Sequence, residues 1–436
     1  MATTADLTEP CFLPAGEAAA AISAGTLTSE ALTASCLRRI AAREPEVHAW
    51  VWLDPEAALA QARARDAEPV RGPLHGVPVG IKDIIDTFDM PTELGCKAFA
   101  ERRPSVDAAG VALLRQAGAV ILGKTVTTEL AGMHPGPTSN PRRIGHTPGG
   151  SSSGSAAAVA DFHVPIALGT QTVGSIVRPA SYCGALGFKP TFDRYPPAGM
   201  MIMAPSLDTL GGFARTGEDL LLLDACLAKD ATPARVDHAP VIGLHRTSMW
   251  DEASPNVHAA FTATADALAA AGARLVDCDL PALADLQQPL IEQHMWEMWN
   301  CFGYLVDEQP DGVSDDFKWL GEMATKVSEA DYRAGCEAQR RGRADFAAGM
   351  DGIDFILTPT AKDVALEGLA ATGDPLFCRN WSSLGVPALG FPAVWDDGLP
   401  IGLQFVGRAG SDRSLLATAA KLLAEIGVIA AIAGPR

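Results

Sequence analysis

Short apolar runs alternate with helical patterns along this chain, and that alternation restricts the fold more than any other feature. The segments "APVIGLHR" and "ARLVDCDLP" have the composition of strands and flank the helical pattern "NVHAAFTATADALAAAG". Strands separated by a helix in this way are typical of βαβ units, whose strands run parallel. Near the C-terminus, two apolar runs are joined through Asp397 and Gly398, a dipeptide typical of tight hairpins. The sequence therefore predicts an α/β fold with a mixed, mostly parallel sheet flanked by helices.

Two regions of the sequence are predicted to be mainly helical. In "TLTSEALTASCLRRIAARE", Thr28 or Ser29 is the expected N-cap of a helix, because apolar residues follow at helical spacing. This helix belongs to an N-terminal helical segment at residues 1–70. A longer helical region at residues 283–350 interrupts the strand pattern before the expected strand "DFILTPT".

Charge and cysteine usage exclude several classes of protein. The formal net charge of −18 leaves no basic stripe for a nucleic acid or an anionic membrane surface. Nine cysteines are scattered singly without a C-x-x-C pair, which favours free thiols in a reducing compartment. The N-terminus lacks a signal-peptide pattern, so we expect a cytoplasmic protein. The histidines show no ligand spacing, so we expect no metal. We also expect no cofactor.

One segment matches a nucleotide-binding motif by letters alone. The stretch "GAVILGKT" satisfies the P-loop pattern G-x-x-x-x-G-K-[ST] and contains Lys124. A phosphate cradle needs a flexible loop between its glycines, whereas the four intervening residues here have the pattern of a buried strand from Ala119 to Leu122. We therefore expect no nucleotide site.

Three other segments carry residues suited to catalysis. The run "TPGGSSSGSAAAVA", Thr147 to Ala160, has the composition of a linker, yet it lies between apolar segments and continues directly into a helix. Lys82 belongs to the alternating strand pattern "HGVPVGIKDIID". The segment "GTQTVGSIVRPASYCG" is predicted to be a strand, a tight turn and a helix, which presents backbone N–H groups at a helix N-terminus.

Together these segments resemble the amidase-signature family of serine hydrolases. The resemblance runs from about Gly76 through "GALGFKPT" and continues more weakly to "GLPIGLQFVGR". It implies one large domain over residues 1–436, in which the helical region 283–350 is an insertion lining the substrate side. It also implies a catalytic triad in which Lys82 is the lysine, Ser151 the serine held by a cis peptide bond, and Ser175 the nucleophile.

The chemistry of these residue types agrees with the roles that the resemblance implies. Serine is a weak nucleophile until a base takes its proton, and lysine can act as that base only when burial lowers its pKa. Ser151 can relay the proton because a hydroxyl both donates and accepts. A tetrahedral intermediate also needs donors for its oxyanion. The expected donors are the backbone N–H groups of Thr172, Val173, Gly174 and Ser175.

The sequence departs from the commonest family form, "DTGGS", near the nucleophile. Gln171 replaces Asp, Val173 replaces the first Gly, and the arginine lies at Arg178, three residues after the nucleophile. This form is similar to that of malonamidases, in which the matching arginine binds the substrate carboxylate. Arg178 is therefore a candidate substrate-binding residue, although it could instead pair with a nearby carboxylate and fix the helix. Gly132 and Met133 are further candidate substrate-binding residues.

The identity of the substrate stays open at the level of sequence. An apolar helical stripe can be a core-facing surface or the wall of a pocket for an aryl or alkyl leaving group. It consists of Ile291, Met295, Met298 and Phe302, with Trp296 and Trp299 adjacent to it. His134 is expected to be a loop histidine rather than a catalytic partner.

The expected function is hydrolysis of the acyl C–N bond of a small amide, anilide or carbamate (urethane) through an acyl-enzyme on Ser175. The expected partner is a small-molecule substrate, with no nucleic acid and no membrane, and a homodimer stays open. The alternatives are a malonamidase-like hydrolase of a small carboxylate-bearing amide and an amidotransferase A-type subunit.

Overall fold

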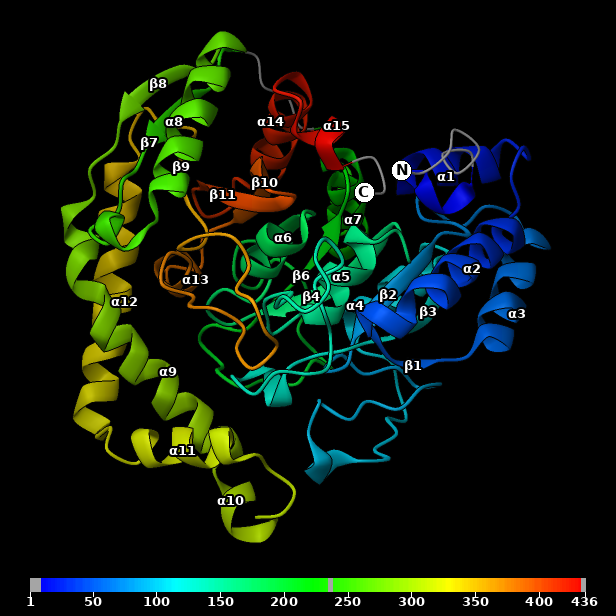
Figure 1. The fold of residues 1–436 in the computed structure, drawn as a ribbon, viewed down its shortest axis with the longest axis horizontal. Coiled ribbons are helices and arrows are strands. Elements are labelled where there is room, and N and C mark those ends of the chain that lie inside the picture. Colours follow the sequence, from blue (N-terminus) through cyan, green and yellow to red (C-terminus); the bar gives the residue numbers. More distant parts are fainter. Residues whose placement is uncertain (1–8, 234–237, 433–436) are drawn as a thin grey trace.

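A single eleven-stranded sheet runs through the molecule (Figure 1). The computed structural model describes residues 9–233 and 238–432. From one edge to the other, the strands are β1 (Trp50–Leu53), β3 (Val120–Thr125), β2 (Pro78–Lys82), β4 (Ile166–Gln171), β6 (Thr209–Ala214), β5 (Leu186–Lys189), β10 (Ala388–Asp396), β11 (Leu399–Gly407), β9 (Phe355–Pro359), β7 (Val241–Leu244) and β8 (Arg274–Asp277).

The sheet is mixed, as the sequence predicts, but the expectation of a mostly parallel sheet is wrong. Within the described strands, only four neighbouring pairs are parallel: β2 with β3 and β4, and β7 with β8 and β9. The other six pairs are antiparallel. Two central strands, β5 and β6, have the glycine-containing sequences "LGFK" and "TLGGFA". Glycine is depleted in strands, so these segments lack the usual strand composition and were not predicted as strands.

The predicted hairpin between β10 and β11 is confirmed. Its two-residue turn consists of Asp397 and Gly398, which have φ values of 44° and 80°. Positive φ at both positions is typical of the type I′ turn that matches the twist of an antiparallel pair.

Helices cover both faces of the sheet and extend beyond it. They are α1 (Ala15–Ser23), α2 (Ser29–Val47), α3 (Pro55–Asp66), α4 (Ala109–Gln116), α5 (Ser153–Ala160), α6 (Val177–Cys183), α7 (Gly217–Leu227), α8 (Pro255–Ala270), α9 (Gln287–Phe302), α10 (Tyr304–Glu308), α11 (Asp315–Ala324), α12 (Glu329–Gly349), α13 (Arg379–Ser383), α14 (Asp412–Glu425) and α15 (Val428–Ile432). Figure 1 shows α9 and α12 side by side on one flank, opposite α2 and α3.

The two regions predicted to be helical are largely so. Thr28 is the N-cap of α2, and its hydroxyl accepts a hydrogen bond from the Ala31 N–H group. The region at 283–350 contains four α-helices, α9 to α12, and no strand among its described residues. The N-terminal segment is not entirely helical, because β1 lies between α2 and α3 and pairs with β3 at the edge of the sheet. Such a four-residue strand is too short to show a clear alternating pattern.

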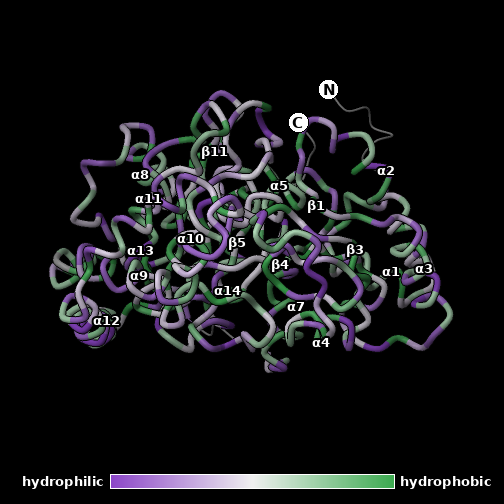
Figure 2. The backbone as a smooth tube through the Cα atoms, turned by 90° about the horizontal axis from the view of Figure 1, so that it is seen from below, coloured by the Kyte–Doolittle hydropathy of each residue, from purple (hydrophilic) through white to green (hydrophobic). Residues whose placement is uncertain are grey.

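The central strands are buried on both faces, and this burial positions the site. Every residue of β2, β3, β4, β5 and β6 is buried, as is every residue of α5. Figure 2 shows hydrophobic chain around β4 at the centre, whereas the peripheral α12 is largely hydrophilic. The nine cysteines are all free. Within the described ranges, none of the helices is long and apolar enough to cross a membrane.

The apolar stripe of α9 packs mostly into the core. Met298 and Phe302 belong to the main hydrophobic cluster, and Met295 and Trp299 pack against it. Trp296 stacks on Tyr332 of α12, with ring centroids 5.6 Å apart. The structure thus gives these side chains the packing expected of a core-facing surface.

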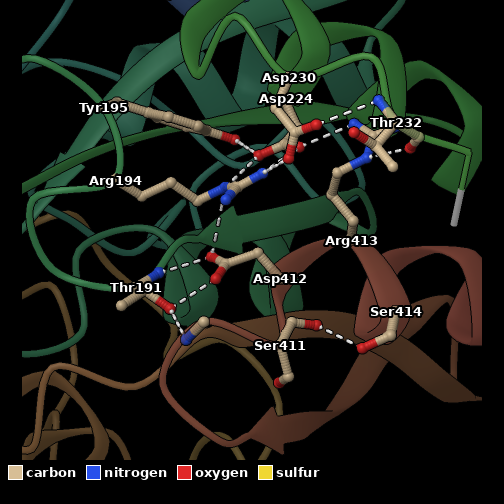
Figure 3. A network of polar contacts seen from close by, with 11 residues as sticks. Thr191, Arg194, Tyr195, Asp224, Asp230, Thr232, Ser411, Asp412, Arg413 and Ser414 are labelled. Atoms are coloured by element: carbon tan, nitrogen blue, oxygen red, sulfur yellow. Dashed lines mark hydrogen bonds and ion pairs between the residues drawn. The ribbon is translucent and has the colours of Figure 1, made fainter.

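A buried carboxylate joins the loop after β5 to the C-terminal part of the chain (Figure 3). Asp224 of α7 has a fully buried side chain and accepts two hydrogen bonds from the Arg194 guanidinium, at 2.7 and 2.8 Å. It also accepts one from the Tyr195 hydroxyl at 2.9 Å and one from Arg413 of α14 at 2.9 Å. One carboxylate therefore connects three segments that are distant in sequence.

We expect Asp224→Ala to lower the free energy of unfolding by about 3–5 kcal/mol, because it removes the carboxylate paired with the partly buried Arg413 and leaves Arg194 with only the longer contacts to Asp230 and Asp412. Urea denaturation followed by circular dichroism measures the change. Glu329→Ala, which removes an exposed ion pair with Arg333, is the control and should change the free energy by less than about 1 kcal/mol. Equal effects of the two substitutions would contradict this account.

Candidate active site

Lys82 lies at the end of β2, next to the end of the parallel strand β4. Its side chain is fully buried, and its Nζ atom lies 2.8 Å from Ser151 Oγ and 2.8 Å from Thr170 Oγ1. Thr170 was not singled out in the sequence, although two parallel neighbouring strands bring residues near their carboxyl ends together. The lysine is thus held by two hydroxyl groups.

Burial lowers the pKa of Lys82 to about 7, while the negative charge of Asp208 opposes that shift. An amine with this pKa is neutral in a large fraction of molecules at neutral pH, whereas an exposed lysine is almost entirely protonated. A neutral amine can accept a proton from the hydroxyl beside it. Lys82 and Ser151 therefore have the geometry and protonation needed for proton transfer.

The serine-rich run is a packed turn that leads into α5. The peptide bond between Gly150 and Ser151 is cis, and Gly149 has a φ of 80°. A Cβ atom on Gly154 would lie 2.2 Å from the Ala49 carbonyl oxygen, so only glycine fits there. The remaining hydroxyls each bond a neighbouring strand end or loop: Ser152 with Thr170, Ser153 with Val126, and Ser155 with Leu168 and Thr125. The linker-like composition therefore reflects close packing and hydrogen bonding.

Ser175 lies in the turn between β4 and α6. Its carbonyl accepts a hydrogen bond from the Ser152 N–H group at 3.3 Å, which brings the turn against the serine-rich run. Within the described residues, its hydroxyl has no hydrogen-bond partner, and neither do four consecutive backbone N–H groups. These are the N–H groups of Thr172, Val173, Gly174 and Ser175, the donors predicted for the oxyanion. The turn thus offers a free hydroxyl and free donors in one place.

The Gln171 side chain binds the N–H groups at the start of α6. Its Oε1 atom accepts hydrogen bonds from the N–H groups of Ile176 at 2.7 Å and Val177 at 3.0 Å. Its Nε2 atom donates to Ser382 Oγ at 2.8 Å, and Ser382 Oγ in turn donates to the Val173 carbonyl at 3.1 Å. Ser382 lies 211 residues from Gln171, and no local signal in the sequence identifies it.

Asp208 is a second residue of the site that no sequence motif identified. Its carboxylate accepts hydrogen bonds from Thr172 Oγ1 at 2.5 Å and from the N–H groups of Met203 at 2.5 Å and Ala204 at 3.0 Å. Burial raises the pKa of Asp208, and these hydrogen bonds oppose that change. Asp208 thus anchors the turn at Thr172 and places a carboxyl group near Lys82.

Arg178 points toward the serine-rich run. The residue is only 4% exposed, and its Nη2 atom donates to the Gly150 carbonyl at 2.7 Å. Its Nη1 atom donates to the Gly373 carbonyl. Within the described chain, no carboxylate forms an ion pair with it, so the structure does not show the pairing offered as an alternative role. Burial lowers the pKa of Arg178.

Gly132 and Met133 lie in a loop that contacts the site through Thr128. The Thr128 N–H group donates to the Ser151 carbonyl at 3.1 Å, and its hydroxyl donates to the Gly132 carbonyl at 2.9 Å. The Met133 side chain is exposed. Gly132 therefore lies beside Thr128, which in turn contacts Ser151, whereas Met133 faces solvent.

Two residues that were not expected to be catalytic lie elsewhere. His134 is an exposed loop residue, as predicted, and its Nδ1 atom lies 2.8 Å from a carboxylate oxygen of Asp316, which is 182 residues away and carries no local sequence signal. Lys124 is fully buried in β3, and its Nζ atom donates to the Ile85 carbonyl at 2.8 Å, so the P-loop letters belong to a strand.

The described residues contain no group of three or more side chains suited to holding a metal ion.

Comparison with known proteins agrees with this geometry. The model of the Amidase family matches residues 31–416. The chain belongs to the Amidase family. The A-type subunit of glutamyl-tRNA(Gln) amidotransferase from Chloroflexus aggregans is 34% identical, over 94% of this chain and 96% of that protein. Its counterpart from Salinispora arenicola is 32% identical, over 97% of this chain and 99% of that protein.

Solved structures of amidases share the fold. A crystal structure of an amidase superposes with a TM-score of 0.88 at 31% identity, covering 94% of this chain and 99% of the other. The peptide amidase from Stenotrophomonas maltophilia gives a TM-score of 0.79 at 29% identity, covering 95% of this chain and 96% of the other. The resemblance to amidase-signature enzymes is confirmed, and the chain is an enzyme that acts on carbon–nitrogen bonds.

We expect Lys82→Met to alter how stability depends on pH. Below pH 7 the lysine is protonated in both the folded and unfolded chain, whereas between pH 7 and 10.5 the unfolded chain holds one more proton. The free energy of unfolding of the wild type should therefore rise with pH in this interval because of Lys82, and the variant should lack that contribution. Chemical denaturation at several pH values measures the difference between the two proteins. A difference that stays constant from about pH 6 to about pH 9.5 would contradict the shifted pKa.

Proposed function

We propose that this amidase cleaves the acyl C–N bond of its substrate through an acyl-enzyme on Ser175. The observation that carries the proposal is the 2.8 Å contact between Lys82 Nζ and Ser151 Oγ, made by a lysine whose pKa is near 7. A lysine at its ordinary pKa would be protonated at neutral pH and could not activate a serine. The turn that carries Ser175 adjoins the loop that carries Ser151, since the Ser152 N–H group donates to the Ser175 carbonyl.

In the proposed acylation step, the Ser175 hydroxyl attacks the substrate carbonyl and its proton passes through Ser151 to Lys82. The C–N bond then breaks, and the nitrogen leaves with a proton returned by the same path. In deacylation, water attacks the ester carbon while Lys82 and Ser151 again accept its proton. The O–C bond to Ser175 breaks, Ser175 regains a proton, and the acid is released.

The N–H groups of the turn at 172–175, which have no partner in the described parts of the chain, support the assignment of the oxyanion hole. Such donors stabilise the negative charge that develops on the carbonyl oxygen in the transition state, and each is typically worth about 3 kcal/mol. Their fixed positions matter because donors that are already oriented need no reorganisation during the reaction.

Two substrate classes have support. Small amides agree with the likeness to amidase structures, including the peptide amidase, and anilides and carbamates would present the same kind of carbonyl to Ser175. A glutamine-type primary amide has stronger support from sequence, because the relatives at 34% identity are A-type subunits of glutamyl-tRNA(Gln) amidotransferase. The 472 aligned positions exceed the 436 residues of this chain, so those relatives have insertions that it lacks. The two classes share the acyl-enzyme step.

A substrate panel tests the proposal and separates the two classes. Initial rates are compared for L-glutamine, malonamate, a neutral aryl amide and an aryl carbamate, with Ser175→Ala as the blank. We expect kcat/KM of the preferred substrate to rise with pH through an inflection near 7, because acylation needs neutral Lys82. Turnover that survives in Ser175→Ala would overturn the mechanism. Preference for glutamine, together with a copurifying partner, would favour the amidotransferase A-type subunit.

The serine-rich run offers a matched control for the proton path. Ser151→Ala should lower kcat by roughly 10⁴-fold, on the scale of other catalytic triads. Ser153→Ala makes the same change two residues away, where the hydroxyl bonds the Val126 carbonyl at 3.3 Å, and should retain most activity. Equal losses in the two variants would show that the loop has only a structural role.

Arg178→Ala distinguishes between two roles for this arginine. The guanidinium donates to the Gly150 and Gly373 carbonyls, so we expect the substitution to lower kcat for anionic and neutral substrates alike. Activity on malonamate and on the neutral aryl amide gives the comparison. A loss confined to malonamate would instead support recognition of a substrate carboxylate, the role implied by the resemblance to malonamidases.

A further inference from the structure

The peptide group between Val173 and Gly174 contacts residues 375–382 on one side. The Val173 carbonyl accepts a hydrogen bond from Ser382 Oγ of α13 at 3.1 Å. Gly174 packs against the same region, since a Cβ atom on Gly174 would lie 3.0 Å from the Cβ atom of Cys378 and 3.1 Å from that of Pro375. This part of the chain therefore backs the turn that carries Ser175.

Anchoring that carbonyl also fixes a hydrogen-bond donor. In a trans peptide, the C=O group and the following N–H group point to opposite sides of the chain. When the Val173 carbonyl points toward Ser382, the Gly174 N–H group points away from it, and this N–H group has no partner among the described residues. It is one of the donors assigned above to the oxyanion hole.

Gln171 determines the direction of the hydrogen bond from Ser382. Gln171 Nε2 donates to Ser382 Oγ at 2.8 Å, so the serine hydroxyl accepts on that side and its own proton is available for the Val173 carbonyl. Gln171 and Ser382 are each only 1% exposed, so water does not compete readily for these groups. The three groups form a directed chain of hydrogen bonds.

We propose that Gln171 and Ser382 are positioning residues that orient the Gly174 N–H group for the oxyanion. This inference rests on the proposed acyl-enzyme chemistry at Ser175. It also gives a reason for the departure from "DTGGS" at position 171. An ionised carboxylate there has acceptor oxygens only, so it has no proton to donate to Ser382. The Ser382 hydroxyl would then donate to the carboxylate and leave the Val173 carbonyl unanchored.

Three substitutions test the chain of hydrogen bonds. Ser382→Ala removes the donor to the Val173 carbonyl, and Gln171→Glu keeps the size and the acceptor for the helix N–H groups while removing the donor to Ser382. We expect each to lower kcat by roughly 10- to 100-fold with little change in KM, because the oxyanion forms only after the substrate has bound. Ser382→Thr retains a hydroxyl and should restore most of the lost rate.

Binding of phenylboronic acid distinguishes a misoriented Gly174 N–H group from a general loss of structure. Boronic acids form tetrahedral adducts with nucleophilic serines, so the inhibition constant of phenylboronic acid should rise by about the same factor as kcat falls. Ser383→Ala is the matched control, because this neighbouring serine is also buried but its Oγ has no partner among the described residues. It should leave kcat and the inhibition constant near their wild-type values.

The outcomes are distinct for this inference and for the proposed function. Equal effects of Ser382→Ala and Ser383→Ala, or an unchanged inhibition constant in Ser382→Ala, would overturn the inference while leaving the acyl-enzyme intact. If Ser382→Ala does not fold, Gln171→Glu decides in the same assays. If a fluorophosphonate does not label Ser175 in the wild type, the proposed function fails, and the inference fails with it.

Discussion

Removal of the Lys82 side chain from water is the interaction on which the rest of the site depends. Desolvation disfavours the ammonium form and leaves an amine able to exchange a proton near neutral pH. The surroundings limit this effect, because Ser151 and Thr170 supply hydroxyl partners and Asp208 supplies a nearby carboxyl group. Burial thus keeps the pKa of Lys82 low enough for a neutral amine, while the two hydroxyl groups still provide hydrogen bonds to it. The fully buried parallel strands β2 and β4 provide the rigid support for this balance.

The turn around Ser175 combines fixed and free groups. Asp208 holds Thr172, Ser382 holds the Val173 carbonyl, and Gln171 caps α6, so much of the turn is restrained by side chains from other parts of the chain. The N–H groups at 172–175 stay without partners among the described residues. Unsatisfied buried donors are costly in an ordinary loop. Here the surrounding contacts keep them available for a developing negative charge.

The sequence predicted the residues that carry recognisable local patterns. Lys82, Ser151 and Ser175 were identified through short motifs, and the structure brings Lys82 into contact with Ser151 and the turn of Ser175 against the same loop. Asp208 and Ser382 were missed because their partners, Thr172 and Gln171, lie 36 and 211 residues away. Hydrogen bonds over such separations leave no periodicity to detect. The glycine-containing β5 and β6 were missed for a different reason, since their pairing in the sheet outweighs weak strand propensity.

The position of the last hairpin has a consequence for how the chain is assembled during synthesis. Strands β10 and β11 lie between β5 and β9, so the two parts of the sheet join only through residues near the C-terminus. A nascent chain that ends before Ala388 leaves the edges of β5 and β9 unpaired. Unpaired edges are templates for aggregation, and both edges stay unpaired from the translation of β9 until β10 and β11 are in place. Because Ser382 is also translated late, the oxyanion turn acquires its backing at nearly the same moment as the sheet becomes continuous.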